Sequence, residues 1–133
     1  MPLGHVGLNV PDLGAAKTYY DQIMPLLAYE EFFSTSEEFS YRPSDGKAGT
    51  FLFFYPQQEP GSYSRHRVGL QHLAFIVKTQ AAVDDAHDFV VQLGSEVLFA
   101  PQEFPQYHPG YYATFWTDPF GQMLEAVHHG RDL

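Results

Sequence analysis

The chain has 133 residues, enough for one domain with its own core, and no cysteine, which excludes disulfides, thiolate metal sites and a cysteine nucleophile. Its formal net charge of −9 argues against nucleic acid as a partner, since phosphate binding needs clustered lysine and arginine. The sequence shows no long apolar run and no signal peptide, so we expect a cytoplasmic protein without a membrane partner.

The first half of the chain, a module of about residues 1–58, predicts a strand, a helix and three further strands. These elements are expected at residues 5–10, 13–27, 29–33, 38–42 and 49–55. Asp12 can cap the first turn of the helix, and Pro25 is expected to bend or end it. A linker rich in proline, glycine and serine follows at 59–67.

The second half, a module of about residues 68–130, repeats this order within the same single domain, 1–133. A strand, a helix and three strands are expected at residues 70–77, 82–93, 96–99, 111–117 and 122–128. Gly94 is expected to end the helix. Three prolines within 100–110 predict a loop there.

An internal repeat relates the two halves. Residues 4–30 align without a gap with residues 71–97, and His5 falls on His72. When the glycines that precede the last strand of each half are aligned, Phe53 falls on Glu125. A carboxylate in the apolar strand around Glu125 is costly unless it has a partner.

The alternation of side chains along a strand predicts where these three polar residues point. His5, His72 and Glu125 alternate with bulky apolar residues that can pack against the helices, so all three are expected on the opposite face. Two imidazoles and one carboxylate are a common ligand set for one divalent ion, whether Fe, Mn, Zn or Ni. A single strand histidine is more often structural, but two at repeat-equivalent positions favour a metal site.

Aromatic side chains are expected to line a substrate cavity beside this site. Phe51, Phe53 and Tyr55 share one strand face, and with Met123 they favour a substrate that is partly apolar. The proline-rich loop is expected to lie over the cavity, with Tyr107 and His108 as acid, base or hydrogen-bonding groups. An ordinary connecting loop is the alternative.

Three segments resemble the vicinal oxygen chelate superfamily, which includes glyoxalase I, extradiol dioxygenases, fosfomycin-resistance enzymes and bleomycin-resistance proteins. They are residues 4–12, residues 70–77, and Thr117-Asp118-Pro119-Phe120-Gly121 leading into Leu124-Glu125. The resemblance implies an α+β fold in which two βαβββ modules form a curved, mixed, eight-stranded sheet around a cavity, with the helices on the outer face. It implies the same metal ligands, from the first and last strands of the modules.

The resemblance also frames the function. Phe53 occupies the position of a fourth ligand and cannot bind a metal, which argues against a typical four-ligand glyoxalase I. We expect a metal-dependent dioxygenase, lyase or isomerase that acts on a small substrate chelated through adjacent oxygens. The alternative is a metal-free binding protein of the bleomycin-resistance kind, although such proteins generally lack the ligand set. Family members commonly form homodimers, and we expect the same here.

Overall fold

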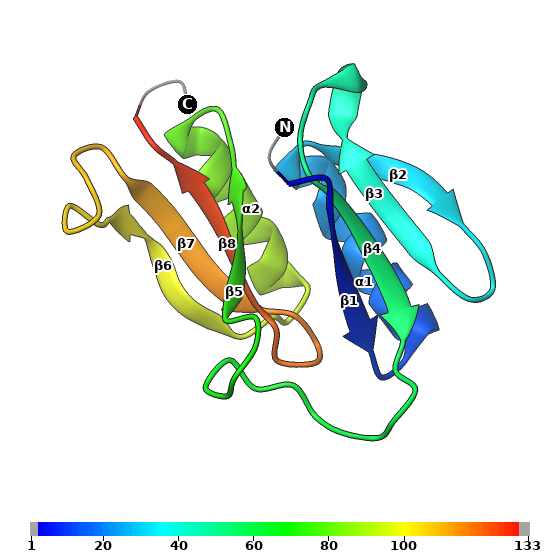
Figure 1. The fold of residues 1–133 in the computed structure, drawn as a ribbon. Helices are drawn as coiled ribbons and strands as arrows, with labels where there is room; N and C mark the ends of the chain where they lie inside the picture. Colours follow the sequence, from blue (N-terminus) through cyan, green and yellow to red (C-terminus); the bar gives the residue numbers. More distant parts are fainter. Residues whose placement is uncertain (1–2, 131–133) are drawn as a thin grey trace. The chain divides into compact units, whose positions relative to one another are not determined.

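The computed structural model describes residues 3–130, and two compact units divide the chain between Ser62 and Tyr63. Each unit contains one four-stranded mixed sheet and one long helix, in the order βαβββ that the sequence predicts (Figure 1). In the described part of the chain, no helix is both long and apolar enough to cross a membrane.

The first unit places its first and last strands side by side. Its elements are β1 (His5–Val10), α1 (Leu13–Ile23), η1 (Met24–Leu27), β2 (Tyr29–Ser34), β3 (Phe39–Pro43), η2 (Ser44–Gly46) and β4 (Phe51–Pro56). The sheet order is β1-β4-β3-β2, with β1 and β4 parallel and the other pairs antiparallel. The parallel pair brings the side chains of β1 and β4 onto shared faces.

Local sequence signals set the ends of α1. The Asp12 carboxylate accepts a hydrogen bond from the Ala15 amide at 3.0 Å, so it caps the helix as predicted. The α-helix ends at Ile23, and a 3₁₀ turn containing Pro25 follows. Proline has no amide hydrogen for an α-helical bond, which explains the change of helix type.

The core of the first unit lies between α1 and the sheet. Tyr20 of α1 contacts Phe54 of β4 with ring centroids 4.5 Å apart, and Phe39 of β3 stacks on Phe54 at 4.8 Å. Along β4, the side chains that face α1 are buried, whereas Phe51, Phe53 and Tyr55 are half-buried on the other face. Strand alternation thus separates the packing face from a face that carries aromatic rings.

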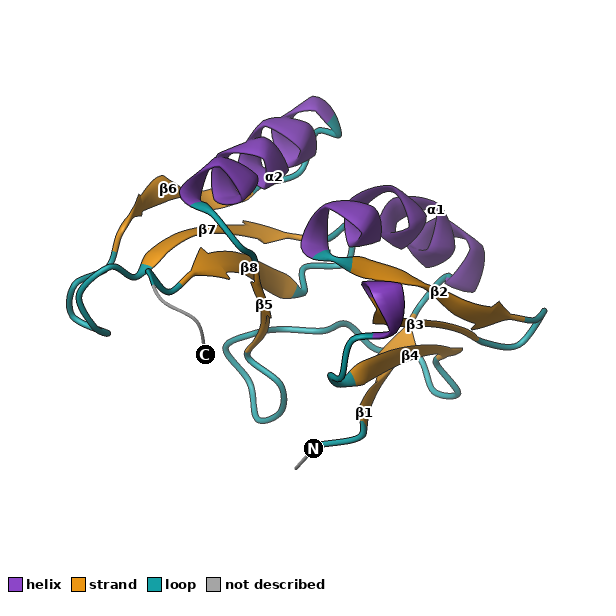
Figure 2. Ribbon diagram, turned by 90° about the horizontal axis from the view of Figure 1, so that it is seen from above, coloured by secondary structure: helices purple, strands orange, loops and turns teal. Residues whose placement is uncertain are grey.

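The second unit has the same arrangement. Its elements are β5 (His72–Ile76), α2 (Gln80–Gln92), β6 (Val97–Glu103), β7 (Tyr112–Thr117) and β8 (Met123–His128). The sheet order is β5-β8-β7-β6, again with the first and last strands parallel. Figure 2 shows α2 over one face of this sheet. Trp116, Leu124 and Ala126 share one face by the strand register and are fully buried.

The loop predicted at 100–110 is wrong in its first part, because β6 continues through Glu103. Pro101 lies within the strand even though it cannot donate a ladder hydrogen bond. β6 is an edge strand, and its register shifts between Phe99 and Gln102. Edges and bulges are the places in a sheet that tolerate proline. The connecting loop is therefore confined to the residues between β6 and β7.

Candidate metal-binding site

The parallel pairing of β5 and β8 brings His72 and Glu125 together. In the register, His72 pairs with Met123 and Ala74 pairs with Glu125, so both side chains stand on the face opposite α2. The His72 Nε2 atom is 3.2 Å from the Glu125 Oε1 atom. The two predicted ligands of the second unit thus form a contact pair.

The orientation of the His72 ring is set by its sequence neighbour. His72 Nδ1 lies 3.0 Å from the side-chain oxygen of Gln71, which can only accept a hydrogen bond. The Nδ1 atom therefore carries the proton, and in the neutral ring Nε2 presents its lone pair to Glu125. Sequence reasoning missed Gln71, although a polar residue next to a predicted ligand is a usable signal.

Glu125 is a buried acid, with 1% of its surface exposed. Burial raises the pKa of Glu125 above its ordinary value, while the hydrogen bond from the Tyr111 hydroxyl and the proximity of His72 act in the opposite direction. The Tyr111 hydroxyl donates to Oε2, the oxygen that does not face His72. Burial is the larger cause of a raised pKa of Tyr111, and its hydrogen bond to Glu125 is the second cause. The Tyr111 hydroxyl therefore stays protonated and remains a donor.

Sequence reasoning also missed Tyr111. Tyr111 lies one residue before β7, and alternation places it on the same face as Phe115, which pairs with Glu125. That shared parity was the available signal.

The spacing of the two donor atoms suits a common metal ion. Donor atoms bound at ~2.1 Å to one ion are separated by about 3.0 Å at a right angle and by about 3.4 Å at a tetrahedral angle. The observed 3.2 Å lies between these values. Imidazole nitrogen and carboxylate oxygen are suitable donors for Fe, Mn, Zn and Ni. Within residues 3–130 no group of three His, Cys, Asp or Glu side chains forms a metal centre, so the geometry rests on this pair.

His5 belongs to the first unit, on the sheet face that α1 does not cover. Its ring contacts Phe53, with centroids 5.1 Å apart and planes at 63°. In the register, Gly7 pairs with Phe53, just as Ala74 pairs with Glu125 in the second unit. The equivalence of Phe53 and Glu125 is therefore structural, and the role of His5 as a ligand stays a prediction.

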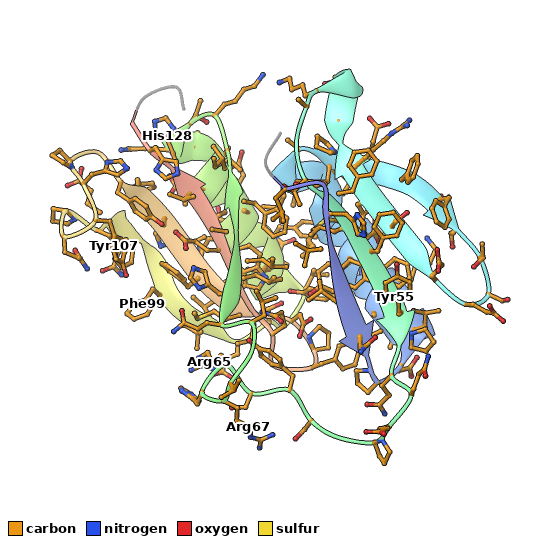
Figure 3. The ribbon with its side chains drawn as sticks, in the orientation of Figure 1. Tyr55, Arg65, Arg67, Phe99, Tyr107 and His128 are labelled. Atoms are coloured by element: carbon orange, nitrogen blue, oxygen red, sulfur yellow. The ribbon has the colours of Figure 1, made fainter. Side chains whose placement is uncertain are left out.

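The predicted aromatic cavity residues share this face with His5. Phe53 contacts Phe33 at 5.8 Å and stacks near Tyr55 at 6.4 Å, and Phe51 contacts Phe32 at 5.1 Å. Figure 3 marks Tyr55 at the end of β4. In the second unit, Met123 packs against a small cluster on the Glu125 face, formed by Phe104, Ala113, Phe115 and Val127. Each unit thus has an apolar surface beside its histidine.

Tyr107 and His108 lie in the loop before β7. Tyr107, labelled in Figure 3, is 59% exposed. Its ring lies 4.9 Å from that of Tyr111. His108 Nδ1 donates to the Pro109 carbonyl at 2.8 Å, and its Nε2 lies 2.9 Å from Nδ1 of His129. The acid, base or lid roles of these two residues remain predictions.

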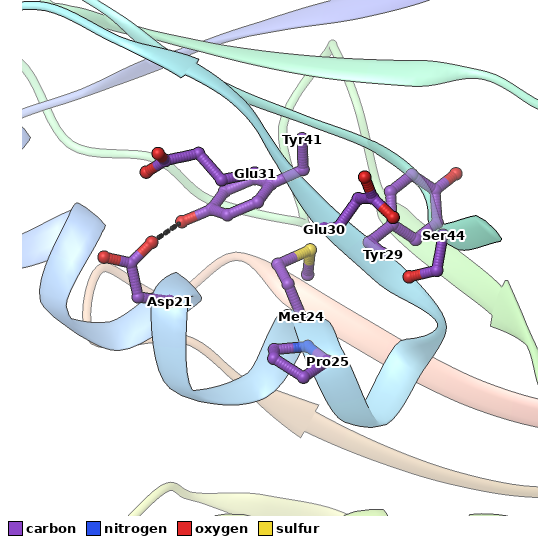
Figure 4. Close-up of a pocket in the computed structure, with 8 residues that line it drawn as sticks. All are labelled: Asp21, Met24, Pro25, Tyr29, Glu30, Glu31, Tyr41 and Ser44. Carbon is purple, nitrogen blue, oxygen red and sulfur yellow. Dashed lines mark hydrogen bonds between the residues drawn. The ribbon is translucent and has the colours of Figure 1, made fainter. Parts of the chain in front are cut away.

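A pocket of about 520 Å³ in the first unit lies between α1, η1 and the strands β2 and β3, and none of the predicted site residues lines it (Figure 4). Its acidic residues already have partners. The Tyr41 hydroxyl donates to Asp21 at 2.7 Å, and Lys17 binds both Asp21 and Glu31 at 2.7 Å. We therefore assign the candidate metal site to the His72 and Glu125 face.

Comparisons with known proteins agree with this fold. The model of the Glyoxalase/Bleomycin resistance protein/Dioxygenase superfamily matches residues 3–126. The uncharacterized protein YqjT of Bacillus subtilis (strain 168) is 30% identical over 126 residues, covering 92% of this chain and 95% of that protein.

Solved structures show the same architecture. A provisionally assigned glyoxalase from Bacillus halodurans superposes with a TM-score of 0.78 and 28% identity, covering 95% of this chain and 94% of that chain. The fosfomycin resistance protein FosX from Listeria monocytogenes shares the fold with a TM-score of 0.68 and 18% identity, covering 95% and 91% of the two chains. The chain therefore belongs to the glyoxalase/bleomycin resistance protein/dioxygenase superfamily.

Proposed function

We propose that this protein is a metal-dependent enzyme that acts on a small, partly apolar substrate chelated through two adjacent oxygens. Its ligands are His5, His72 and Glu125, and its reaction is of dioxygenase, lyase or isomerase type. The observation that carries the proposal is the His72–Glu125 pair, with its two donor atoms 3.2 Å apart on the face opposite α2. Membership of the superfamily supports the same conclusion.

The protonation pattern around His72 favours a cation. Gln71 accepts from Nδ1, so Nε2 of the neutral ring and the Glu125 carboxylate are two acceptors that face one another. A proton or a metal ion must lie between them. A metal-ligating histidine usually donates its other N–H to an outer acceptor, which is the role that Gln71 has here.

Each group then has a distinct task. His5, His72 and Glu125 would hold a divalent ion, which when bound would supply Lewis acidity toward the two substrate oxygens. Gln71 fixes the ring of His72, and the half-buried Phe51, Phe53 and Tyr55 offer apolar contacts for the rest of the substrate. With Phe53 at the fourth position, only three protein ligands would hold the ion, which would leave positions for substrate oxygens.

Metal analysis is the test of this proposal. Protein purified without a histidine tag and incubated in turn with Fe²⁺, Mn²⁺, Zn²⁺ and Ni²⁺ should bind about one equivalent of at least one of them. His72→Ala and Glu125→Ala should abolish this binding. His87→Ala is the matched control, since His87 lies on α2 and contacts Asp88 instead. Less than about a tenth of an equivalent bound by the wild type would refute the enzyme proposal and support the metal-free binding alternative.

The reaction type can be tested once a metal is bound. If iron is the metal that binds, oxygen uptake with catechols would support a dioxygenase, and no uptake would favour a lyase or an isomerase. A homodimer is also proposed, as in the family this chain resembles. Light scattering at micromolar concentration should then give twice the monomer mass of 15.1 kDa, and a monomeric mass would contradict it.

A further inference from the structure

The two oxygens of the Glu125 carboxylate have different partners. Oε1 faces His72 Nε2 at 3.2 Å, and Oε2 accepts the hydroxyl hydrogen of Tyr111. The carboxylate is buried, so it cannot rotate freely into water. The Tyr111 bond therefore determines which of the two oxygens is available at the candidate metal site.

The Tyr111 ring is itself held on several sides. Its centroid lies 4.9 Å from the ring of Tyr107, 5.3 Å from that of His108 and 5.2 Å from that of His129. The 2.9 Å contact between His108 Nε2 and His129 Nδ1 joins the loop before β7 to the residue just after β8. Because β8 carries Glu125, this contact ties Tyr111 to the strand of its carboxylate partner.

The backbone reinforces this tie at two glycines. Gly110 precedes Tyr111, Gly130 follows His129, and both have left-handed backbone conformations, with φ of 86° and 79°. A Cβ atom built on Gly130 would lie 3.1 Å from the Cα and carbonyl oxygen of Gly110. The two backbones approach this closely because neither residue has a side chain. Tyr111 thus starts from a fixed point next to β8.

We propose that Tyr111 is a positioning residue for Glu125. By occupying Oε2, it directs Oε1 toward the ion shared with His72, so that Glu125 binds through one oxygen. This inference rests on the proposed function, since it needs a metal at that site. Removal of outer partners of metal ligands typically weakens metal affinity by about 10- to 100-fold.

The test compares Tyr111→Phe with Tyr107→Phe. Both variants lose one phenolic hydroxyl, from rings that lie 4.9 Å apart, but only Tyr111 donates to Glu125. The Kd for Zn²⁺ is measured by competition with a chelating dye, and the visible absorption of the Co²⁺ form is recorded. Tyr111→Phe should raise the Kd about tenfold or more and change the Co²⁺ spectrum, because the released Oε2 can also bind the ion. Tyr107→Phe should leave both unchanged.

A second measurement reads the hydrogen bond without metal. Infrared spectra of protein labelled with ¹³C-glutamate should show one carboxylate band that shifts in Tyr111→Phe and not in Tyr107→Phe. The infrared band reports loss of the hydrogen bond, and circular dichroism of the same variants reports any loss of the fold.

The outcomes separate the two proposals. If Tyr111→Phe binds metal like the wild type while His72→Ala does not bind, the positioning role is refuted and the proposed function stands. An unshifted infrared band refutes the positioning role in the same way. If the wild type binds no metal, the proposed function fails and the positioning role fails with it.

Discussion

Phe53 occupies in β4 the position that Glu125 occupies in β8. Each lies opposite the residue two positions after its unit's histidine, Gly7 after His5 and Ala74 after His72. The same backbone therefore supports two kinds of contact, an aromatic one between His5 and Phe53 and a polar one between His72 and Glu125. The duplication is symmetric in its fold and asymmetric in its chemistry.

This equivalence predicts the effect of Phe53→Glu. The variant places a carboxylate beside His5, as Glu125 stands beside His72. If His5 shares one ion with His72 and Glu125, the new carboxylate becomes a fourth ligand. Isothermal titration with Zn²⁺ should then give one equivalent with a Kd at least about ten times lower, or about 1.4 kcal/mol.

The control for this prediction is Phe53→Gln, which has the same shape as the glutamate variant and is a poor ligand. It should not tighten binding, although it removes the same ring from contact with His5. Binding of a second equivalent by Phe53→Glu would mean that His5 and the introduced carboxylate form a separate site, and the shared three-ligand site would be wrong.

The buried carboxylate of Glu125 predicts a pH-dependent stability of the metal-free protein. Burial raises its folded-state pKa above the ordinary 4.5, so the folded protein holds this proton more tightly than the unfolded chain. The stability from this group is fully present below the unfolded pKa and falls as the pH rises through the folded pKa. Glu125→Gln lacks this loss, and its amide can donate to His72 Nε2 while its oxygen still accepts from Tyr111.

Glu125→Gln should therefore unfold at a higher temperature than the wild type at pH 8 in EDTA, and the difference should shrink toward pH 4.5, the ordinary pKa of the carboxyl. Thermal unfolding across this range measures it. Glu103→Gln, at an exposed position on β6, is the control and should show a smaller effect. A difference in unfolding temperature between Glu125→Gln and the wild type that is constant with pH would show that titration of Glu125 is not the cause. With added metal the wild type should unfold at a higher temperature than Glu125→Gln, because the metal favours the ionised carboxylate.

The turn before β8 also depends on one buried acid, Asp118. Asp118 is buried, and its Oδ1 atom accepts from the amides of Phe120 at 2.8 Å and Gln122 at 2.9 Å. Asp118→Ala leaves both amides without this acceptor and should lower the free energy of unfolding by about 2 kcal/mol. Asp118→Asn keeps an acceptor oxygen and should recover most of the loss in urea denaturation. If both variants lower the free energy of unfolding equally, the loss comes from the charge of Asp118 rather than from its hydrogen bonds to the turn amides.

The sequence predicts this fold well because its signals act over a few neighbouring residues and because the order of elements occurs in both halves of the repeat. Asp12 caps α1, Pro25 ends it, and strand alternation puts His72 and Glu125 on one face. The failure at Pro101 has a tertiary cause, since only the sheet order shows that β6 is an edge strand.

The candidate site was less predictable than the fold. Gln71 and Tyr111 act through side-chain hydrogen bonds whose partners depend on strand register. Repeat alignment and alternation can nominate a ligand, but they do not specify which polar neighbour orients it. Tyr111 in addition depends on the approach of Gly110 to Gly130, a contact between segments that lie far apart in sequence order.

That approach predicts the effect of Gly130→Ala. Alanine at φ of 79° is strained, and its Cβ would lie 3.1 Å from the Gly110 backbone, so the loop that carries Tyr111 must move away from β8. Gly94→Ala is the matched control, because Gly94 has a similar φ of 80° and open space at its Cβ. The backbone strain of about 1–2 kcal/mol is common to both variants in urea denaturation. Only Gly130→Ala should lower the free energy of unfolding by more than this amount and also bind Zn²⁺ more weakly. Equal stability and equal Zn²⁺ affinity in the two variants would show that the Gly110–Gly130 approach does not position Tyr111.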